Sequence, residues 1–242
     1  MSDGQRLQPD KVRAWDLPTR LFHWALVAAV AFGWISYQYS DRLNDPTLSY
    51  HRWNGHAILV LIVFRLLWGV FGSSTARLSA LFNWPWRAAG YGFALVRGMP
   101  RLYLGHNPLG AYMIVALLFA IAVQSVLGLF TDEHNGATSG PLYRLASDER
   151  REVISHWHSW LFYWVILVLA GVHLAASILY GIIWKEPLIT AMITGKKPAE
   201  SYEDAQEAEI VHRPLLRALL CLVAANVIVF GTILALGGKF LP

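Results

Sequence analysis

Long apolar stretches alternate with short polar ones along most of the chain. Five apolar runs approach or exceed the roughly 20 residues that a helix needs to cross a membrane. They are Leu21–Tyr39, Ala57–Phe71, Leu109–Phe130, Trp157–Trp184 and Leu215–Leu236. The second run is the shortest and contains a charged residue, Arg65. The pattern predicts an all-α integral membrane protein: a four-helix transmembrane bundle core plus a fifth C-terminal transmembrane helix.

The polar segments divide the chain into four predicted parts. Residues 1–20 form an N-terminal segment, residues 21–184 the four-helix membrane domain, residues 185–214 a mixed-charge linker and residues 215–238 the fifth helix. Between the second and third runs, a stretch rich in Trp and Arg has no long apolar run, which indicates a segment lying on the membrane surface. This stretch is Phe82–Arg101.

Composition and charge agree with a membrane class. The chain is 55% hydrophobic and 15% charged, with a mean hydropathy of +0.40, which excludes an ordinary soluble protein. The net charge of +4 does not indicate nucleic-acid binding, because the positive residues gather in three of the polar segments. These residues are Lys11, Arg13, Arg20, Arg77, Arg87, Arg97, Arg101, Lys185, Lys196, Lys197, Arg213 and Arg217. The positive-inside rule then predicts a multi-pass membrane protein with its N-terminus in the cytoplasm and its C-terminus on the outer side.

Two further features narrow the class. Cys221 is the only cysteine, so the chain has neither an internal disulfide nor the Cys-x-x-Cys-His motif of a covalent c-type haem. The first apolar run continues past Ala29–Ala31, which resembles a cleavage site, so we expect an uncleaved first transmembrane helix.

The fourth apolar run carries two histidines, His158 and His173. A helix places them about 22 Å apart along its axis and only about 60° apart around it. An ionisable residue at membrane depth is costly and usually faces the bundle interior, where it marks a pathway or a cofactor. One interpretation is a histidine bonded to a neighbouring helix. The other is that this helix supplies one axial ligand to each of two b-type haems.

Histidines on the first two helices are candidate partners. His23 lies about one turn into the first span, and an interfacial residue pairing with Asp16 or water is the alternative for it. His51 and His56 compete at the start of the second span. Helical pitch places Arg65 about 21 Å beyond His51 and about 40° around from it, but about 180° from His56. If Arg65 faces the bundle, His51 does too.

Arg65 and His106 each have two interpretations. Arg65 can bind a haem propionate, because a guanidinium binds a carboxylate bidentately, or it can extend to the lipid headgroups. His106 precedes the third span; it can assist quinone protonation with a pKa near neutrality, or simply cap that helix. The third span holds Gln124 but no histidine, so we expect it to serve packing, with Gly128 as a close contact for a flat ligand.

Placed on the predicted topology, the histidines form two layers. His23 with His173 lies towards the inner side, and His51 with His158 lies at the outer side. Two strong axial ligands are what haem iron in electron-transfer proteins requires. Zinc is a rival, since His156 and His56 also lie at the outer side, but zinc sites need three or four ligands in one place.

Several segments together resemble the bacterial di-haem cytochrome b-561 family, which includes the b-type cytochrome subunits of nickel-iron hydrogenases. The resemblance extends from about Val12 to Lys197. The matching pieces are Pro18–Trp24, His51–Gly55, Phe64–Gly69, Gly105–Gly110, Val172–His173, Lys185–Met192 and Thr194–Gly195.

The resemblance implies two non-covalent haems, the inner one held by the first and fourth helices and the outer one by the second and fourth. Carried over, this gives His23 with His173 and His51 with His158, with Arg20 and Arg65 among the haem-binding residues. The two ligands of the fourth helix are one residue further apart here than in the family. Either a π-bulge absorbs that residue, or His156 replaces His158.

The predicted function is transmembrane electron transfer between a membrane quinone and a periplasmic redox partner, such as a c-type cytochrome or a hydrogenase or other dehydrogenase module. One alternative within the family is a quinone reductase that oxidises superoxide. Another is a membrane anchor or transporter whose histidines are structural or relay protons. A third retains a single haem, with His51 and His56 as surface residues.

Overall fold

The computed structural model describes residues 11–99, 101–132, 138–205 and 209–240. The first half of the predicted N-terminal segment and Gly136 of the polar loop after the third span lie outside the described residues. The helices are α1 (Leu17–Gln38), α2 (Ser49–Phe71), α3 (Pro85–Val96), α4 (Pro108–Gly128), α5 (Asp148–Leu161), α6 (Leu167–Ile183), α7 (Leu188–Thr194) and α8 (Pro214–Ala235). Two short strands, β1 (Lys11–Arg13) and β2 (Lys196–Pro198), three 3₁₀ turns (Ser74–Ala76, Leu78–Leu81, Tyr143–Leu145) and a π-helical turn (Phe162–Ile166) complete the described elements.

Within the described ranges, five helices are long and apolar enough to cross a membrane. They are α1, α2, α4, α8 and the continuous helix Asp148–Ile183, in which the π-helical turn joins α5 to α6. The prediction of an all-α integral membrane protein with five spans is confirmed.

All five of these helices begin before their apolar runs, and a carboxylate sets the start of two of them. The carboxylate of Asp16 accepts a hydrogen bond from the backbone N–H of Thr19 at 2.7 Å, so α1 begins four residues before the predicted span. Asp45 accepts from the backbone N–H groups of Ser49 and Tyr50 at 2.9 and 2.7 Å, and α2 begins eight residues early. Because capping satisfies the first N–H groups of a helix, polar residues rather than hydropathy determine where these helices begin.

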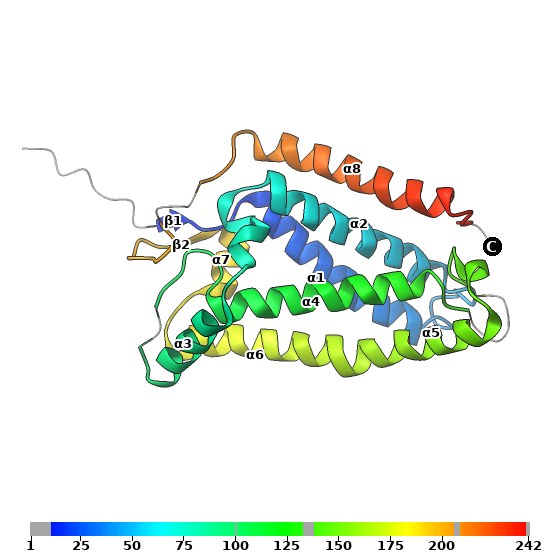
Figure 1. Ribbon diagram of the computed structural model, residues 1–242, viewed down its shortest axis with the longest axis horizontal. Helices are drawn as coiled ribbons and strands as arrows, with labels where there is room; N and C mark the ends of the chain where they lie inside the picture. The colour runs from blue at the N-terminus through cyan, green and yellow to red at the C-terminus, as the bar shows by residue number, and fades with distance from the viewer. Residues whose placement is uncertain (1–10, 100, 133–137, 206–208, 241–242) are drawn as a thin grey trace, which may run out of the picture.

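The connections gather at the two ends of the bundle (Figure 1). At one end β1 and β2 pair antiparallel, with Val12 opposite Lys197. Helix α7 packs beside them, and α3 lies at the same end against α4. We call this the sheet end. The connections 39–48, 129–132 and 138–147 lie at the opposite end, which we call the loop end.

Helix α2 is the central helix and packs against α1, α4 and α8. One face buries Val60, Phe64 and Trp68 in the largest apolar cluster, together with α8, and the Trp68 indole donates a hydrogen bond to the Thr19 hydroxyl at 3.1 Å. The other face buries Ile62 against α4 and the π-helical turn. Helix α4 also packs against α5 and α6, so α2 and α4 connect the first helix to the fourth span.

The segment predicted as a linker folds against the sheet end. Lys197 of β2 is 1% exposed, and its ammonium lies 2.7 Å from the Glu186 carboxylate and donates to the Tyr103 carbonyl at 2.7 Å. A small apolar cluster including Trp15 and Tyr202 lies beside it. This segment therefore joins the N-terminal strand to the loop that precedes α4.

Candidate functional site

Two histidines meet at the loop end. His51 stands in the first turn of α2 and His158 near the end of α5, and their ring centroids are 6.2 Å apart with planes at 85°. The Nδ1 atom of His51 bonds the Gly33 carbonyl at 2.8 Å, and Nδ1 of His158 bonds the Gln124 carbonyl at 3.0 Å. Because a carbonyl only accepts, both Nδ1 atoms carry a proton, and in a neutral imidazole this leaves Nε2 as the acceptor atom. This is the arrangement that orients a histidine for metal binding.

His51 and His158 both line a cavity of about 190 Å³. Gly33, Gly55, Gly128 and Gly140 also line it. A side chain at Gly128 would lie 3.1 Å from the His158 ring, which leaves room for glycine alone without displacing the ring. Gly128 thus contacts the His158 ring, and its expected contact with a flat ligand stays a prediction.

A second pair of histidines lies towards the sheet end. His23 of α1 and His173 of α6 have ring centroids 6.4 Å apart with planes at 54°. The His23 ring also packs edge-on against Trp24, and its buried Nδ1 atom has no hydrogen-bond partner among the described residues. The interfacial pairing of His23 with Asp16 is not what the structure shows, because that carboxylate caps α1.

Both separations suit one metal ion between two imidazoles. With metal–nitrogen bonds of about 2.0 Å and about 1.1 Å from nitrogen to ring centre, such rings lie roughly 6.2 Å apart. Among the described residues, no group of three or more His, Cys, Asp or Glu side chains could hold a metal ion. Two protein ligands are sufficient for haem, because the porphyrin supplies the other four nitrogens. The two pairs therefore fit haem better than zinc.

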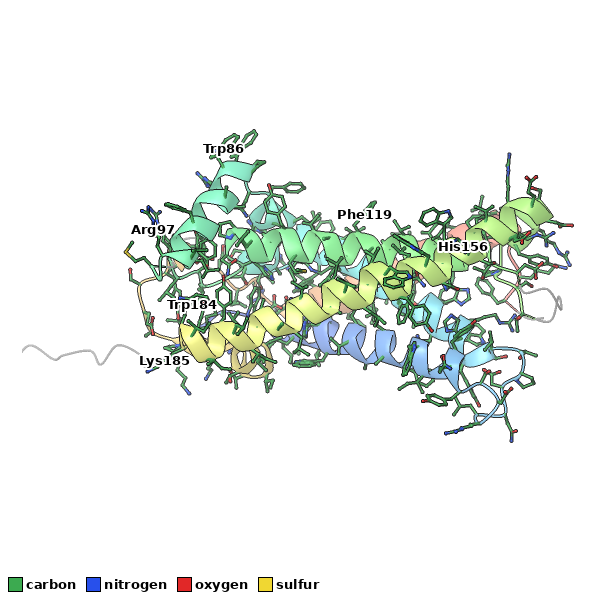
Figure 2. The ribbon with its side chains drawn as sticks, turned by 90° about the horizontal axis from the view of Figure 1, so that it is seen from below. Trp86, Arg97, Phe119, His156, Trp184 and Lys185 are labelled. Atoms are coloured by element: carbon green, nitrogen blue, oxygen red, sulfur yellow. The ribbon has the colours of Figure 1, made fainter. Side chains whose placement is uncertain are left out.

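The π-helical turn Phe162–Ile166 lies between His158 and His173. Such a turn accommodates one extra residue within a helix. The fourth span therefore contains a π-bulge, which is one of the two arrangements considered for its extra residue; the other was replacement of His158 by His156. His156, the alternate residue, is exposed on the outer face of α5, where its ring packs against Trp157 (Figure 2). His56 faces α8 instead, where its ring stacks on Phe230 at 6.0 Å.

Two arginines approach the pair at the sheet end. Arg65 is 4% exposed, and its Nη1 atom has no hydrogen-bond partner within the described part of the chain. Arg20 donates to the Ile193 carbonyl, but its buried Nε atom has no partner there either. Buried donors without partners are rare and costly. These two guanidinium groups fit an anionic group, such as a haem propionate, that the protein atoms do not supply.

His106 lies beside these groups. Its ring centroid is 4.8 Å from that of Trp15, and its buried Nδ1 atom is without a hydrogen-bond partner among the residues described. Burial, followed by the positive charges of Arg65 and Lys197, lowers the pKa of His106 to about 3. The expectation of a pKa near neutrality is therefore wrong. The capping alternative is wrong too, because Asn107 caps α4.

Sequence reasoning missed residues that position these groups. Gln124 was assigned to packing, yet its carbonyl accepts from His158 and its side-chain nitrogen lies 3.2 Å from His158 Nε2. A polar residue at membrane depth was the signal for it. Asp204 accepts from the backbone N–H of Gly105 at 2.8 Å and so fixes the loop that carries His106. Nothing in the mixed-charge segment distinguished Asp204 from its neighbours.

The chain matches a known protein family. A model of the family described as prokaryotic cytochrome b561 matches residues 14–195. The chain belongs to the prokaryotic cytochrome b561 family. The matched residues include α1 to α7 and both histidine pairs, whereas α8 lies beyond them.

Curated relatives of this cytochrome b561 are similar over most of their length. A probable Ni/Fe-hydrogenase B-type cytochrome subunit of Cupriavidus necator is 23% identical over 214 residues, covering 75% of this chain and 84% of the relative. A protein of the same description from Rhizobium leguminosarum bv. viciae is 22% identical over 226 residues, covering 82% of this chain and 93% of the relative. The chain is thus a multi-pass membrane b-type cytochrome of electron transfer, and its cofactor is haem b.

Proposed function

We propose that this cytochrome binds two b-type haems and carries electrons across the membrane between the quinone pool and a redox partner on the other side. In the proposed assignment His23 and His173 hold one haem and His51 and His158 the other, within the domain 21–184. The observation that carries the proposal is the ring separation of the two pairs, 6.4 and 6.2 Å. Bound haem supplies a one-electron carrier at each position.

The chain's own residues orient and tune these positions. The carbonyls of Gly33 and Gln124 hold the Nδ1 atoms of His51 and His158, which fixes the orientation of each ring and raises the basicity of Nε2 as a ligand. Arg20 and Arg65 supply the positive charge for propionates at the sheet end. Along the fourth span His158 and His173 are about 21 Å apart, because the π-helical turn absorbs one of the 15 residue steps between them. The membrane crossing is therefore divided into shorter transfers.

We place the quinone at the sheet end, near His106. With its pKa lowered to about 3, His106 is neutral at physiological pH and acts there as a hydrogen-bonding group rather than as a proton store. The partner at the loop end is a c-type cytochrome or a hydrogenase-like module. This assignment is supported by the hydrogenase subunits named among the relatives.

The proposed orientation has the sheet end in the cytoplasm and the C-terminus in the periplasm of a bacterial inner membrane. The Lys- and Arg-rich segments converge at the sheet end, as the positive-inside rule requires of a cytoplasmic side. Single cysteines at Arg42 and Arg97, in a Cys221→Ser background, test the orientation. A membrane-impermeant maleimide should label the first in intact spheroplasts and the second only after lysis; the reverse pattern would refute it.

Haem content of purified variants tests the two-haem assignment. We expect about two haems per chain in the parent and about one in His173→Ala and in His51→Ala, with a different spectral component lost in each. His156→Ala, at an exposed residue, is the matched control that should retain both. A parent with one haem, or a His51→Ala protein that keeps two, would contradict the assignment.

Transfer across the membrane is tested in proteoliposomes. Quinol added on the sheet-end side should reduce a c-type cytochrome enclosed on the loop-end side, and His51→Ala should abolish this transfer. The superoxide-oxidising alternative predicts that superoxide at the loop-end side reduces the haems and then quinone, without any protein partner.

A further inference from the structure

Helix α8 is packed tightly although it lies beyond the residues that the family model matches. Its face towards α2 repeats every four residues as Cys221, Ala225, Val229 and Ile233, none more than 7% exposed. Small side chains on this face let the two helices approach closely. Figure 1 shows α8 lying along the whole length of α2 and ending at the loop end. The helix is therefore part of the core rather than a loosely attached anchor.

The C-terminal end of α8 is attached to the loop that lines the His51–His158 cavity. Gly237 has a φ of +78°, which turns the chain so that the backbone N–H of Lys239 donates to the Pro141 carbonyl at 3.2 Å. A side chain at Gly238 would lie 2.9 Å from Leu142. The contact thus depends on glycine at the end of the helix.

Backbone contacts join that loop to the end of α4, beside His158. The backbone N–H of Leu142 donates to the Leu129 carbonyl at 2.8 Å. A side chain at Gly140 would lie 2.4 Å from the Gly128 carbonyl, so the loop is pressed against the end of α4. Gly128 in turn faces the His158 ring. Because these groups are in close contact, we expect a shift of α8 at this end to move the His158 ring.

A second route runs through α2. Phe240 stacks on Trp53 at 6.2 Å and meets His56 edge-on at 5.5 Å, while Phe230 stacks on His56 from α8. His56 is 6% exposed and its Nδ1 atom bonds the Arg52 carbonyl at 2.7 Å. These contacts hold the first two turns of α2, which carry His51.

We infer that α8 is a positioning element for the His51–His158 site, acting through Phe240 on α2 and through the 139–142 loop on His158. The inference rests on the proposed function, because it assumes that these histidines hold a haem. It gives the fifth span a role in the redox chemistry, beyond membrane anchoring, and confines that role to one of the two haems.

The test uses full-length Phe240→Ala in detergent, with both haems resolved by redox titration and by the low-spin ferric resonance. That resonance depends on the angle between the two imidazole planes, which is 85° for His51 and His158. We expect the midpoint potential and the resonance of this component to shift and those of the other to stay. One haem should also dissociate about tenfold faster, the lower limit of what losing an outer-sphere partner costs.

Matched variants separate this role from general loosening. Phe240→Leu keeps the apolar volume and should restore parent behaviour. Leu220 is 61% exposed on α8, and Cys221 is buried nearer the sheet end of the same helix. Leu220→Ala and Cys221→Ala should leave both components unchanged. Should Phe240→Ala fail to accumulate, Phe230→Ala has the same expected result.

Two results would overturn the inference: unchanged resonances and potentials in folded Phe240→Ala and Phe230→Ala, or an equal shift of both components. Failure of the proposed function is distinguishable, because His51→Ala would then retain two haems.

Discussion

Removing one partner of the buried ion pair at the sheet end should destabilise the protein strongly. Lys197 and Glu186 are 1% and 8% exposed, and their charged atoms are 2.7 Å apart. The ammonium also donates to the Tyr103 carbonyl and lies 5.7 Å from the Tyr202 ring centre. Lys197→Met keeps much of the side-chain volume and leaves the Glu186 carboxylate without its partner.

The magnitude follows from two opposing contributions. At 2.7 Å and an effective dielectric constant of about 20, the two charges attract by about 6 kcal/mol. Removing each ion from water costs several kcal/mol, so the intact pair contributes little net stability. In Lys197→Met the Glu186 carboxylate still pays for its removal from water but has no opposite charge to attract it. The expected loss of folding stability is about 3–5 kcal/mol. Glu186→Leu combined with Lys197→Met removes both charges and should recover most of that loss.

Thermal unfolding of the full-length protein in detergent, followed by circular dichroism, measures the effect. About 2–4 °C per kcal/mol for a chain of this size predicts a Tm lowered by roughly 6–20 °C in Lys197→Met. Arg97→Met, at an exposed residue that projects from α3 at the sheet end (Figure 2), is a matched control that removes one positive charge. A Lys197→Met protein within 2 °C of the parent, or a double variant no more stable than Lys197→Met, would refute the reasoning.

Three further substitutions have definite expected results. Gly128→Val places a side chain against the His158 ring, because a Cβ atom at residue 128 would lie 3.1 Å from His158 Cε1, so one haem should be lost and the spectrum should match that of a His158→Ala protein. Burial lowers the pKa of His106 to about 3, so below pH 6.5 the unfolded chain binds a proton at this residue and the folded protein does not. The stability of the protein therefore falls by at most about 1.4 kcal/mol per pH unit between pH 6.5 and 3. The Tm of His106→Gln should fall less than that of the parent between about pH 7 and 4.5, and equal acid sensitivity would contradict this. Gly195→Ala forces alanine into a φ of +81° with its Cβ 2.8 Å from the Trp15 carbonyl oxygen, which should cost about 1–3 kcal/mol in thermal unfolding, whereas Gly90→Ala, where nothing lies within 4 Å, should cost nothing.

Local patterns were sufficient to predict the helices and much of the geometry within each one. A run of apolar residues long enough to span a membrane has few alternatives to a helix, because every backbone polar group must be satisfied internally. Helical pitch likewise places His51 and Arg65 on one face and His56 on the other, and the structure has His56 facing α8. The starts of α1, after Asp16, and of α2, after Asp45, were missed, because a hydropathy pattern does not show capping by a single carboxylate.

Contacts between distant segments were decided by the tertiary structure alone. The pKa of His106 depends on burial and on Arg65 and Lys197, which are far away in the sequence, so an isolated histidine value was misleading. The role of Gln124 beside His158 depends on how α4 packs against α5. The sequence by itself determined the spans and the face that each histidine occupies, since both follow from the fixed pitch of a helix. Which faces meet, and at what distance, depends on packing between helices and therefore on the whole fold.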